Sequence, residues 1–385
     1  MGLSTYLALK EIWRNRGRFF LVALVIALIT LLVLFIAALG EGLGTNNRQY
    51  VANRDAQLVV FLDKSDFIIS SSRLDQSALK AVRRVDGIVE AGPISTSSTA
   101  ILLDNGKVLK VSMLGVEPGR PGLPPVVEGR TYQTQLAKEA VIDRNVALRS
   151  DIKVGDEITI RSTQGTKDEF FTLKVVGLTE GQAYFFAPTI FVPPSTWERV
   201  RPKSEAEANK TIPDINVIAV KLEDPGQAEV MKTKIESLVS NVQAADIETT
   251  IQNIPGYSAQ QGTVQTQGVF TLLIGVLVIG GFFQIQILQK VAQIGVLKAI
   301  GAPNFLVGLA SVIQIVMVTT IGVAIGGLGV FLLSLGFPPT IPIVFNGQST
   351  ALAVIALLLI GPIGGLVSIR YAVRIEPLRA LGLGG

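Results

Sequence analysis

The sequence contains no cysteine and no histidine. Without cysteine, structural disulfides and thiolate metal sites are excluded. Without histidine, the usual general base is missing, so the serines of "SSSR" and "STSS" have nothing to activate them. The segment "LLDNGKVL" has a Gly-Lys pair but lacks the upstream glycine of a phosphate-binding loop. We therefore expect no catalytic residue, no metal site and no cofactor in this chain, and any energy must come from a partner.

Charge is also scarce. Charged residues make up 17% of the chain, whereas soluble domains carry about 25%. None occurs between Glu248 and Lys290, or between Lys298 and Arg370. The net charge of +4 is too small and too localised to indicate nucleic-acid binding. This distribution predicts a membrane region plus one soluble region.

Four apolar runs are long enough to cross a bilayer, which takes about 20 residues. They predict transmembrane helices over residues 19–43, 263–288, 305–335 and 350–369. The first run is longer than a signal-peptide core and continues into "GEGLG" without a clear cleavage pattern, so we expect a retained span. Gly322-x-x-x-Gly326 and Gly361-x-x-x-Gly365 place small residues on one helix face, and we expect them to pack within one chain.

Basic residues near the ends of spans predict the orientation. Nine of them fall on one side: Lys10, Arg14, Arg16, Arg18, Lys290, Lys298, Arg370, Arg374 and Arg379. We therefore expect an amphipathic helix over 1–18, a connector over 289–304 and a tail over 370–385, all cytoplasmic. Residues 44–262 and the loop 336–349 would lie outside. The predicted fold class is an α-helical membrane domain of one plus three transmembrane helices, with a large α+β extracytoplasmic domain inserted between helices 1 and 2.

The external domain contains two patterns typical of strand–helix–strand segments. The first runs from "QLVVFL" through a helix over 75–85, and the second from "INVIAVKL" into a helix bearing Val230, Ile235 and Leu238. Between them, apolar and polar residues alternate along parts of 120–213, which predicts a strand-rich insert. Asn105-Gly106 predicts a hairpin. Asp143, Asp156 and Glu157 stand beside turns, where we expect them to be solvated.

The segment 289–307, "QKVAQIGVLKAIGAPNFLV", predicts a short helix between two spans. Val291, Ile294, Leu297 and Ile300 recur every third residue, Gly301 suits a left-handed cap, and Pro303 can start the next helix. From this pattern alone, two roles of the helix remain open: a connector that lies on the membrane, or a contact surface for a partner.

Several segments resemble the FtsX-like (MacB-like) permeases of ABC transporters. "QIGVLKAIGAPNFLV" is similar to the connector of that family, with Gln293 where a glutamate is common. "AVRIEPLRALG" (372–382) resembles the family's closing segment, and "ALKEIWRNRGRFFLVALVIALI" its first span. "MLGVEP", "VVEGR", "EAVIDRNVA", "VGDEITI" and "LKVVGL" follow the order of its periplasmic domain. The DevC-like and heme-exporter-like branches are the most similar.

The resemblance implies a multi-pass protein of the bacterial plasma (inner) membrane that forms a homodimer, through the first and second spans, and has no nucleotide site of its own. A separate ABC ATPase would hold ATP and Mg and bind the cytoplasmic connector. Closure of the ATPase would then move the external domains by mechanotransmission, for export or efflux, with a periplasmic adaptor as a further partner. The implied coupling residues are Gln293, Ile294, Leu297, Lys298, Ile300 and Gly301.

Two alternatives remain at this stage. One is an FtsX-like regulator of an extracytoplasmic enzyme. The other is an exporter of heme or another amphiphile from the outer leaflet, with Glu41, Tyr50 and the region of Met113 as polar contacts.

Overall fold

The chain, a computed structural model, is described over residues 2–104, 106–207, 214–338 and 341–374. It divides into two compact units. Residues 1–42 with 261–385 form the helical unit, and residues 43–260 form the α/β domain. Helices α2 (Arg16–Ala52) and α8 (Tyr257–Leu288) cross the two boundaries, so each contributes residues to both units.

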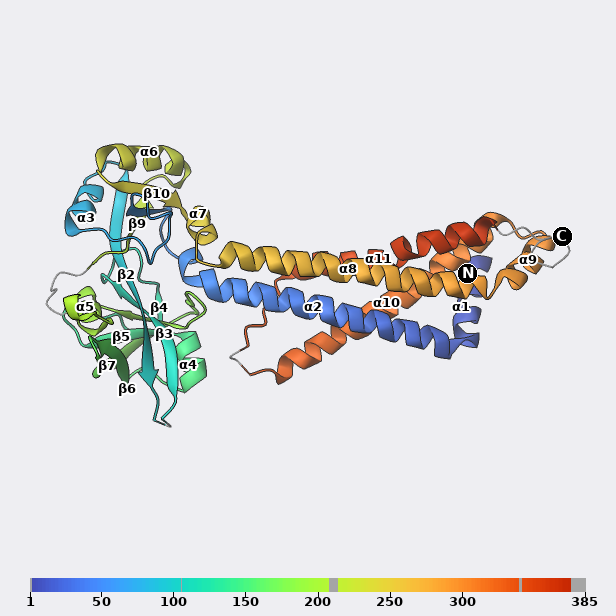
Figure 1. Ribbon diagram of the computed structural model, residues 1–385, viewed down its shortest axis with the longest axis horizontal. Helices are drawn as coiled ribbons and strands as arrows, with labels where there is room; N and C mark the ends of the chain where they lie inside the picture. Colours follow the sequence, from blue (N-terminus) through green and yellow to red (C-terminus); the bar gives the residue numbers. More distant parts are fainter. Residues whose placement is uncertain (1, 105, 208–213, 339–340, 375–385) are drawn as a thin grey trace. The chain divides into compact units, whose positions relative to one another are not determined.

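In its described residues, the helical unit contains four helices long and apolar enough to cross a membrane (Figure 1). They are α2, α8, α10 (Asn304–Gly336) and α11 (Gly347–Arg374). In a bilayer each backbone N–H and C=O must be satisfied within the segment, which a continuous helix achieves. Two shorter helices, α1 (Leu3–Arg14) and α9 (Val291–Ala299), complete this unit, and α1 packs against α10. Each of the apolar runs predicted as spans therefore lies in a long helix.

Glycines allow these helices to approach closely. A Cβ atom on Gly322 would lie 2.6 Å from the Cβ of Ile26, and one on Gly326 would lie 2.6 Å from the Cβ of Thr30, so α10 packs tightly on α2. A Cβ on Gly365 would meet the side chain of Ile315, so α11 packs tightly on α10. The expectation that both Gly-x-x-x-Gly motifs pack within one chain is confirmed.

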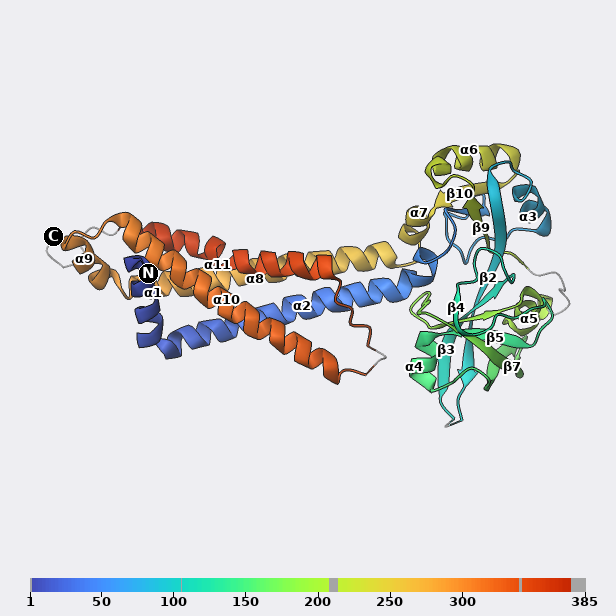
Figure 2. The ribbon, with the colours of Figure 1, turned by 180° about the vertical axis from the view of Figure 1, so that it is seen from behind.

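The α/β domain is built on one mixed sheet, with strand order β10-β1-β9-β2-β3-β8-β5-β7-β4 and β6 joined to β2 and β7. The strands are β1 (Leu58–Leu62), β2 (Ile88–Leu102), β3 (Val108–Val116), β4 (Val126–Gly129), β5 (Glu139–Asp143), β6 (Glu157–Gln164), β7 (Lys167–Thr179), β8 (Thr189–Val192), β9 (Val217–Leu222) and β10 (Val242–Asp246). The helices are α3 (Gln76–Val82), α4 (Arg144–Ser150), α5 (Pro194–Val200), α6 (Ala228–Leu238) and α7 (Ile247–Gln252), as Figure 2 shows from the opposite side.

Strands from the two ends of this domain interleave. The segments β1–α3–β2 and β9–α6–β10 are the two predicted strand–helix–strand segments. β9 lies between β1 and β2, and β1 lies between β9 and β10, with antiparallel pairing throughout. This is the split β-α-β arrangement of ferredoxin-like folds. The strands between 108 and 192 extend the sheet beyond β2.

Both faces of the interleaved strands are buried. Helices α3 and α6 cover one face, where Leu79 and Ile235 pack against Leu58 and Val60 of β1. Of the three apolar residues that marked α6 in the sequence, Ile235 is buried, whereas Val230 and Leu238 are 65% and 62% exposed. The buried stripe of α6 runs through Met231 and Ile235 instead, because residues four apart share a helix face.

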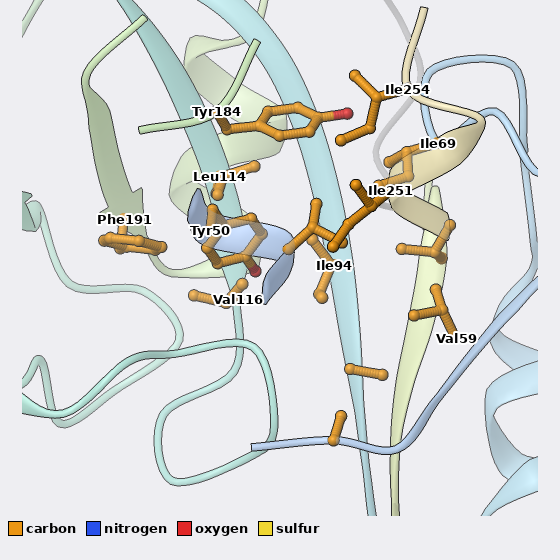
Figure 3. Packing of buried hydrophobic residues seen from close by; sticks show 14 of the residues in the cluster. Tyr50, Val59, Ile69, Ile94, Leu114, Val116, Tyr184, Phe191, Ile251 and Ile254 are labelled. Atoms are coloured by element: carbon orange, nitrogen blue, oxygen red, sulfur yellow. The ribbon is translucent and has the colours of Figure 1, made fainter. Parts of the chain in front are cut away.

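The opposite face packs against the end of α2. Figure 3 shows the Tyr50 ring between Phe191 and Ile94, next to Leu114 and Val116. Strand β3 serves two cores, because alternate side chains point to opposite faces of a strand. Leu114 and Val116 join the cluster around Tyr50, whereas Val111 and Met113 join a second cluster with Trp197 of α5. The hairpin predicted between β2 and β3 is present, with Gly106 at a φ of 75°, while Asn105 lies outside the described residues.

Candidate coupling surface

Helix α9 ends in a Schellman cap. Gly301 has a φ of 97°, its N–H donates to the Lys298 carbonyl at 3.0 Å, and the Ala302 N–H donates to the Leu297 carbonyl at 3.1 Å. These two bonds around a left-handed residue define the motif, which glycine adopts without a Cβ clash. The left-handed position predicted for Gly301 is confirmed. Pro303 is the N-cap of α10 rather than its first residue.

One side of α9 is exposed. The exposed residues are Ala292, Gln293, Val296, Ala299 and Ile300. At about 100° per residue these positions fall within an arc of about 120° on the helix surface. The arc contains no charged side chain. It is therefore a narrow, mostly apolar surface, with Gln293 as its polar member.

The other side of α9 packs against the long helices. Ile294 and Leu297 contact a small core made by Ile287 of α8, Val307 of α10 and Ala372 of α11. Ile294 and Leu297 therefore lie on a different side of α9 from Ile300, although the family resemblance grouped all three as coupling residues.

The physical reason is the spacing of three residues. Each step of three advances about 300° around the helix, so the stripe drifts by about 60° and turns by about 180° between Val291 and Ile300. Ile300 is accordingly 77% exposed, while Ile294 and Leu297 face inward. The family resemblance implied Ile294, Leu297 and Ile300 as coupling residues. Of these three, Ile300 is exposed in this structure, and Val296 is the other large apolar residue of the arc.

Lys298 also belongs to the inward side. Its Nζ donates a hydrogen bond of 2.7 Å to the carbonyl of Val373 in α11. Desolvation lowers the pKa of this amine below its ordinary value. The family resemblance implied Lys298 as a coupling residue, and here its side chain ties α9 to α11.

Glu11 of α1 anchors the start of α9. It forms an ion pair with Lys290, the N-cap residue of α9, and its Oε2 accepts a hydrogen bond of 2.6 Å from Gln314 Nε2 of α10. Sequence reasoning missed this residue. A signal was present, because Glu11 is the only acidic residue among the first 40 and stands within a basic stretch. One carboxylate thus connects three helices at the base of α9.

A cavity of about 370 Å³ opens where α1, α8, α9 and α10 meet. Its lining includes Glu11, Lys290, Ile294 and Leu297, so it adjoins the inward side of α9, and it reaches Gln293 at the edge of the exposed arc.

Two of the residues proposed as polar contacts for an amphiphile, Tyr50 and Met113, lie in different core clusters. Tyr50 is 1% exposed, and its hydroxyl donates to the Gly122 carbonyl at 2.8 Å. Met113 is fully buried in a different core cluster. Glu41 belongs to the helical unit, where its Oε1 accepts a bond of 3.4 Å from Asn346 Nδ2. In this conformation Tyr50 and Met113 are packing residues.

Asp143 was expected to be solvated, and this was wrong. It is fully buried, and its carboxylate caps α4 by accepting from the Val146 N–H at 2.8 Å and the Gln182 N–H at 3.1 Å. Burial raises the pKa of this carboxyl above its ordinary value. Asp156 and Glu157 are exposed, as expected. Within the described ranges, no group of three or more acidic, histidine or cysteine residues is arranged to hold a metal ion.

The structure thus combines four long apolar helices, an α/β domain and a short connecting helix within its described residues. Residues 19–238 match the MacB-like periplasmic core domain, and residues 267–377 match the FtsX-like permease C-terminal domain. The chain belongs to the FtsX/MacB-like family of ABC transporter permeases. It is therefore a membrane-embedded permease subunit, and its family implies an ATPase partner.

Relatives match this chain from end to end. A protein named hemin transport system permease HrtB from Staphylococcus haemolyticus is 24% identical over 379 residues, covering 98% of this chain and 99% of the relative. An ABC transporter permease of Mycobacterium tuberculosis (strain H37Rv) is 24% identical over 384 residues, with the same coverage of 98% and 99%. The solved periplasmic region of MacB from Actinobacillus actinomycetemcomitans shares 16% identity, covers 56% of this chain and 97% of that structure, and has a TM-score of 0.35.

Proposed function

We propose that this permease converts ATP hydrolysis by its partner into movement of the α/β domain, and that the exposed arc of α9 is the contact through which the ATPase acts. The observation that carries this proposal is the pair Val296 and Ile300, which are 48% and 77% exposed on a helix whose other side is fixed. Exposed apolar residues beside a rigid support are the kind of surface that a partner buries. Gln293 would lie at the rim of this contact.

The support for a mechanical role is the way α9 is held. Ile294 and Leu297 pack on α8, α10 and α11, Lys298 bonds to α11, and Gly301 caps the helix directly before α10. A push on α9 would therefore be passed to three long helices. In this proposal Val296 and Ile300 contact the ATPase, whereas Ile294, Leu297, Lys298 and Gly301 keep the lever rigid.

The proposed orientation follows from the basic residues near the helix ends. Residues 1–18, 289–304 and 370–385 would be cytoplasmic, and residues 44–262 and 336–349 extracytoplasmic. One span would precede the external domain and three would follow it. We further propose a homodimer, an external adaptor as an additional partner, and ATP and Mg held by the ATPase alone.

Single substitutions on the exposed arc test the coupling contact. Val296→Asp and Ile300→Asp each place a charge in the proposed interface. Truncating a central anchor costs at least about 2 kcal/mol, or roughly 30-fold in affinity, so permease-stimulated ATP hydrolysis by the cognate ATPase should fall to the unstimulated rate. Insertion and folding should be retained, because both positions are exposed.

Two control variants make the test specific. Leu148→Asp changes a leucine that is 58% exposed in the α/β domain, and stimulation should be unaffected. Leu297→Asp instead buries a charge on the inward side, so it should lower the thermal stability of the permease as well as the stimulation. Full stimulation in both arc variants would show that α9 is only a connector.

For the substrate, we propose a hemin-like amphiphile exported from the membrane, because a relative matched over 98% of this chain carries a hemin transport name. The test is hemin titration of the purified permease–ATPase complex, followed by absorbance and ATPase rate. Co-purification with a cell-wall enzyme and no hemin response would instead favour the FtsX-like regulator.

A further inference from the structure

The cavity at the base of α9 has a strong charge imbalance. Four cationic side chains line it, Lys10, Arg14, Arg18 and Lys290, against one acidic side chain, Glu11. The cavity therefore has an excess of three positive charges. Its volume of about 370 Å³ falls in the range of small-molecule sites, roughly 300–1,000 Å³.

The four cations differ in what they already contact. Lys290 is paired with Glu11, and Arg18 Nη1 donates to Gln289 Oε1 at 2.7 Å. Among the described residues, Lys10 makes only a long bond of 3.5 Å to the Tyr6 hydroxyl and lies over the Tyr6 ring. Across the described ranges Arg14 forms no hydrogen bond or ion pair. Arg14 and Lys10 are thus the groups available to a ligand.

The uncharged part of the lining is mixed. Its apolar residues include Leu7 of α1, Phe283 and Ile287 of α8, and Leu306, Val307 and Ile315 of α10, and its polar residues are Asn15, Gln286, Gln289, Gln293, Ser311 and Gln314. A site for a free anion would need only the cationic end. A wall with a cationic end and an apolar side fits a molecule that carries both an anionic head and hydrocarbon chains.

We propose that this cavity binds an anionic phospholipid, with the headgroup phosphate at Arg14 and Lys10 and the start of an acyl chain against the partly exposed Leu7 and Leu306. Basic pockets between membrane helices on the cytoplasmic side are suited to such headgroups, and this leaflet assignment rests on the orientation proposed above. The bound lipid bridges α1 and the start of α9, where Glu11 already joins them. It stabilises the base of the coupling helix.

The matched comparison is Arg14→Gln against Arg16→Gln. Both remove one positive charge from the same stretch, but Arg14 lines the cavity and Arg16 does not. Purified full-length permease in neutral detergent is titrated with phosphatidylglycerol or phosphatidylcholine of identical acyl chains, and binding is read by native mass spectrometry. We expect preferential binding of phosphatidylglycerol by the wild type. Arg14→Gln should weaken it about fivefold, equivalent to about 1 kcal/mol for one basic residue.

Arg16→Gln should leave the binding unchanged, and Arg14→Lys should retain most of it. A thermal melt without added lipid checks that every variant is folded. Equal weakening by Arg14→Gln and Arg16→Gln would overturn the proposal in favour of diffuse surface attraction. Displacement of the lipid by inorganic phosphate at matched ionic strength would overturn it in favour of a free-phosphate site. Loss of ATPase binding in Arg14→Gln with lipid binding intact would overturn it in favour of a protein contact.

Discussion

Asp143 and Glu198 are both buried acidic residues of the α/β domain, but their surroundings differ. Among the described residues, the hydrogen bonds to Asp143 come from neutral donors, the backbone N–H groups of Val146, Gln182 and Thr189 and the side chain of Asn145. Glu198 has Arg201 Nε at 2.9 Å and Lys203 Nζ at 3.0 Å. The first is a helix cap whose charge is costly to bury, and the second is the centre of a buried ion-pair cluster.

Asp143→Asn tests the effect of pH. Because burial raises the folded-state pKa of Asp143, the folded protein holds the proton more tightly than the unfolded chain. The free energy of unfolding should therefore fall as pH rises from the unfolded pKa, about 3.9, toward the folded value, by up to about 1.4 kcal/mol per pH unit. Asparagine still caps α4 and cannot ionise. Chemical unfolding of both proteins is measured from pH 4 upward. The unfolding free energy of the wild type minus that of Asp143→Asn should decrease as pH rises. A difference that does not change with pH would contradict the prediction.

Glu198→Ala tests the ion-pair cluster. Removing one partner of a buried pair typically costs about 3–5 kcal/mol, because the remaining charges lose their compensation. Here Arg201 and Lys203 would each lose their contact with Glu198, in a site where these three side chains are at most 10% exposed, while Arg201 would keep Glu207 at 3.3 Å. We expect a lower denaturation midpoint, with Glu198→Gln losing less. Glu157→Ala, on the exposed side of β6, should change stability by at most about 0.5 kcal/mol.

At the scale of elements, contact between long helices depends on residues without side chains. Gly326 of α10 lies against the Ala27 carbonyl and Thr30 of α2, and Gly280 of α8 lies against Gly364 of α11. Between lipid-embedded helices, close packing rather than the hydrophobic effect drives association. The helical unit therefore depends on these close approaches.

Gly326→Ala tests the contact between α2 and α10. The added methyl group would overlap the Ala27 carbonyl, and overpacking of this kind costs about 1–3 kcal/mol. The thermal unfolding midpoint of the permease in detergent should fall. Gly281→Ala is the matched control, because a Cβ there meets nothing within 4 Å, and replacing a helical glycine should stabilise by about 0.5–1 kcal/mol. Equal shifts in both variants would show that the contact is unimportant.

At the scale of the whole molecule, the distribution of charge governs how the chain can sit in a bilayer. The four long helices contain few charges, and the nine basic residues near their ends all predict the same side. The absence of native cysteine makes this orientation simple to test, since a single introduced thiol has no background.

Single-cysteine labelling tests the orientation. Lys107→Cys lies in the exposed β2–β3 turn and Ala292→Cys on the exposed arc of α9. An impermeant maleimide added to intact cells should label position 107 and should label position 292 only after the membrane is opened. The reverse pattern would overturn the orientation and, with it, the cytoplasmic placement of the coupling surface.

The patterns of apolar, charged and turn-forming residues in the sequence predicted some parts of the structure well and others poorly. The apolar runs, both strand–helix–strand segments, the Gly301 cap and the β2–β3 hairpin depend on local periodicity and turn chemistry, which can be read from neighbouring residues. The inward side of α9, the burial of Asp143 and the Glu11 contact could not be read in this way. Each depends on partners far away in the sequence, such as Gln314 for Glu11 and Gln182 for Asp143.

The sequence by itself determined that this is a membrane protein with four long apolar helices and a domain of mixed helices and strands, predicted as α+β, because the length of an apolar run, its hydropathy and the spacing of charges can be read from neighbouring residues. It also carried the motifs of the permease family. Only the tertiary structure decided which side of α9 is free, because a stripe with a period of three drifts around the helix and the neighbouring helices select the part that is buried. The same holds for the cavity: Lys10 and Arg14 are distant in sequence from Lys290 and Phe283, and only the packing of α1 against α10 brings them together.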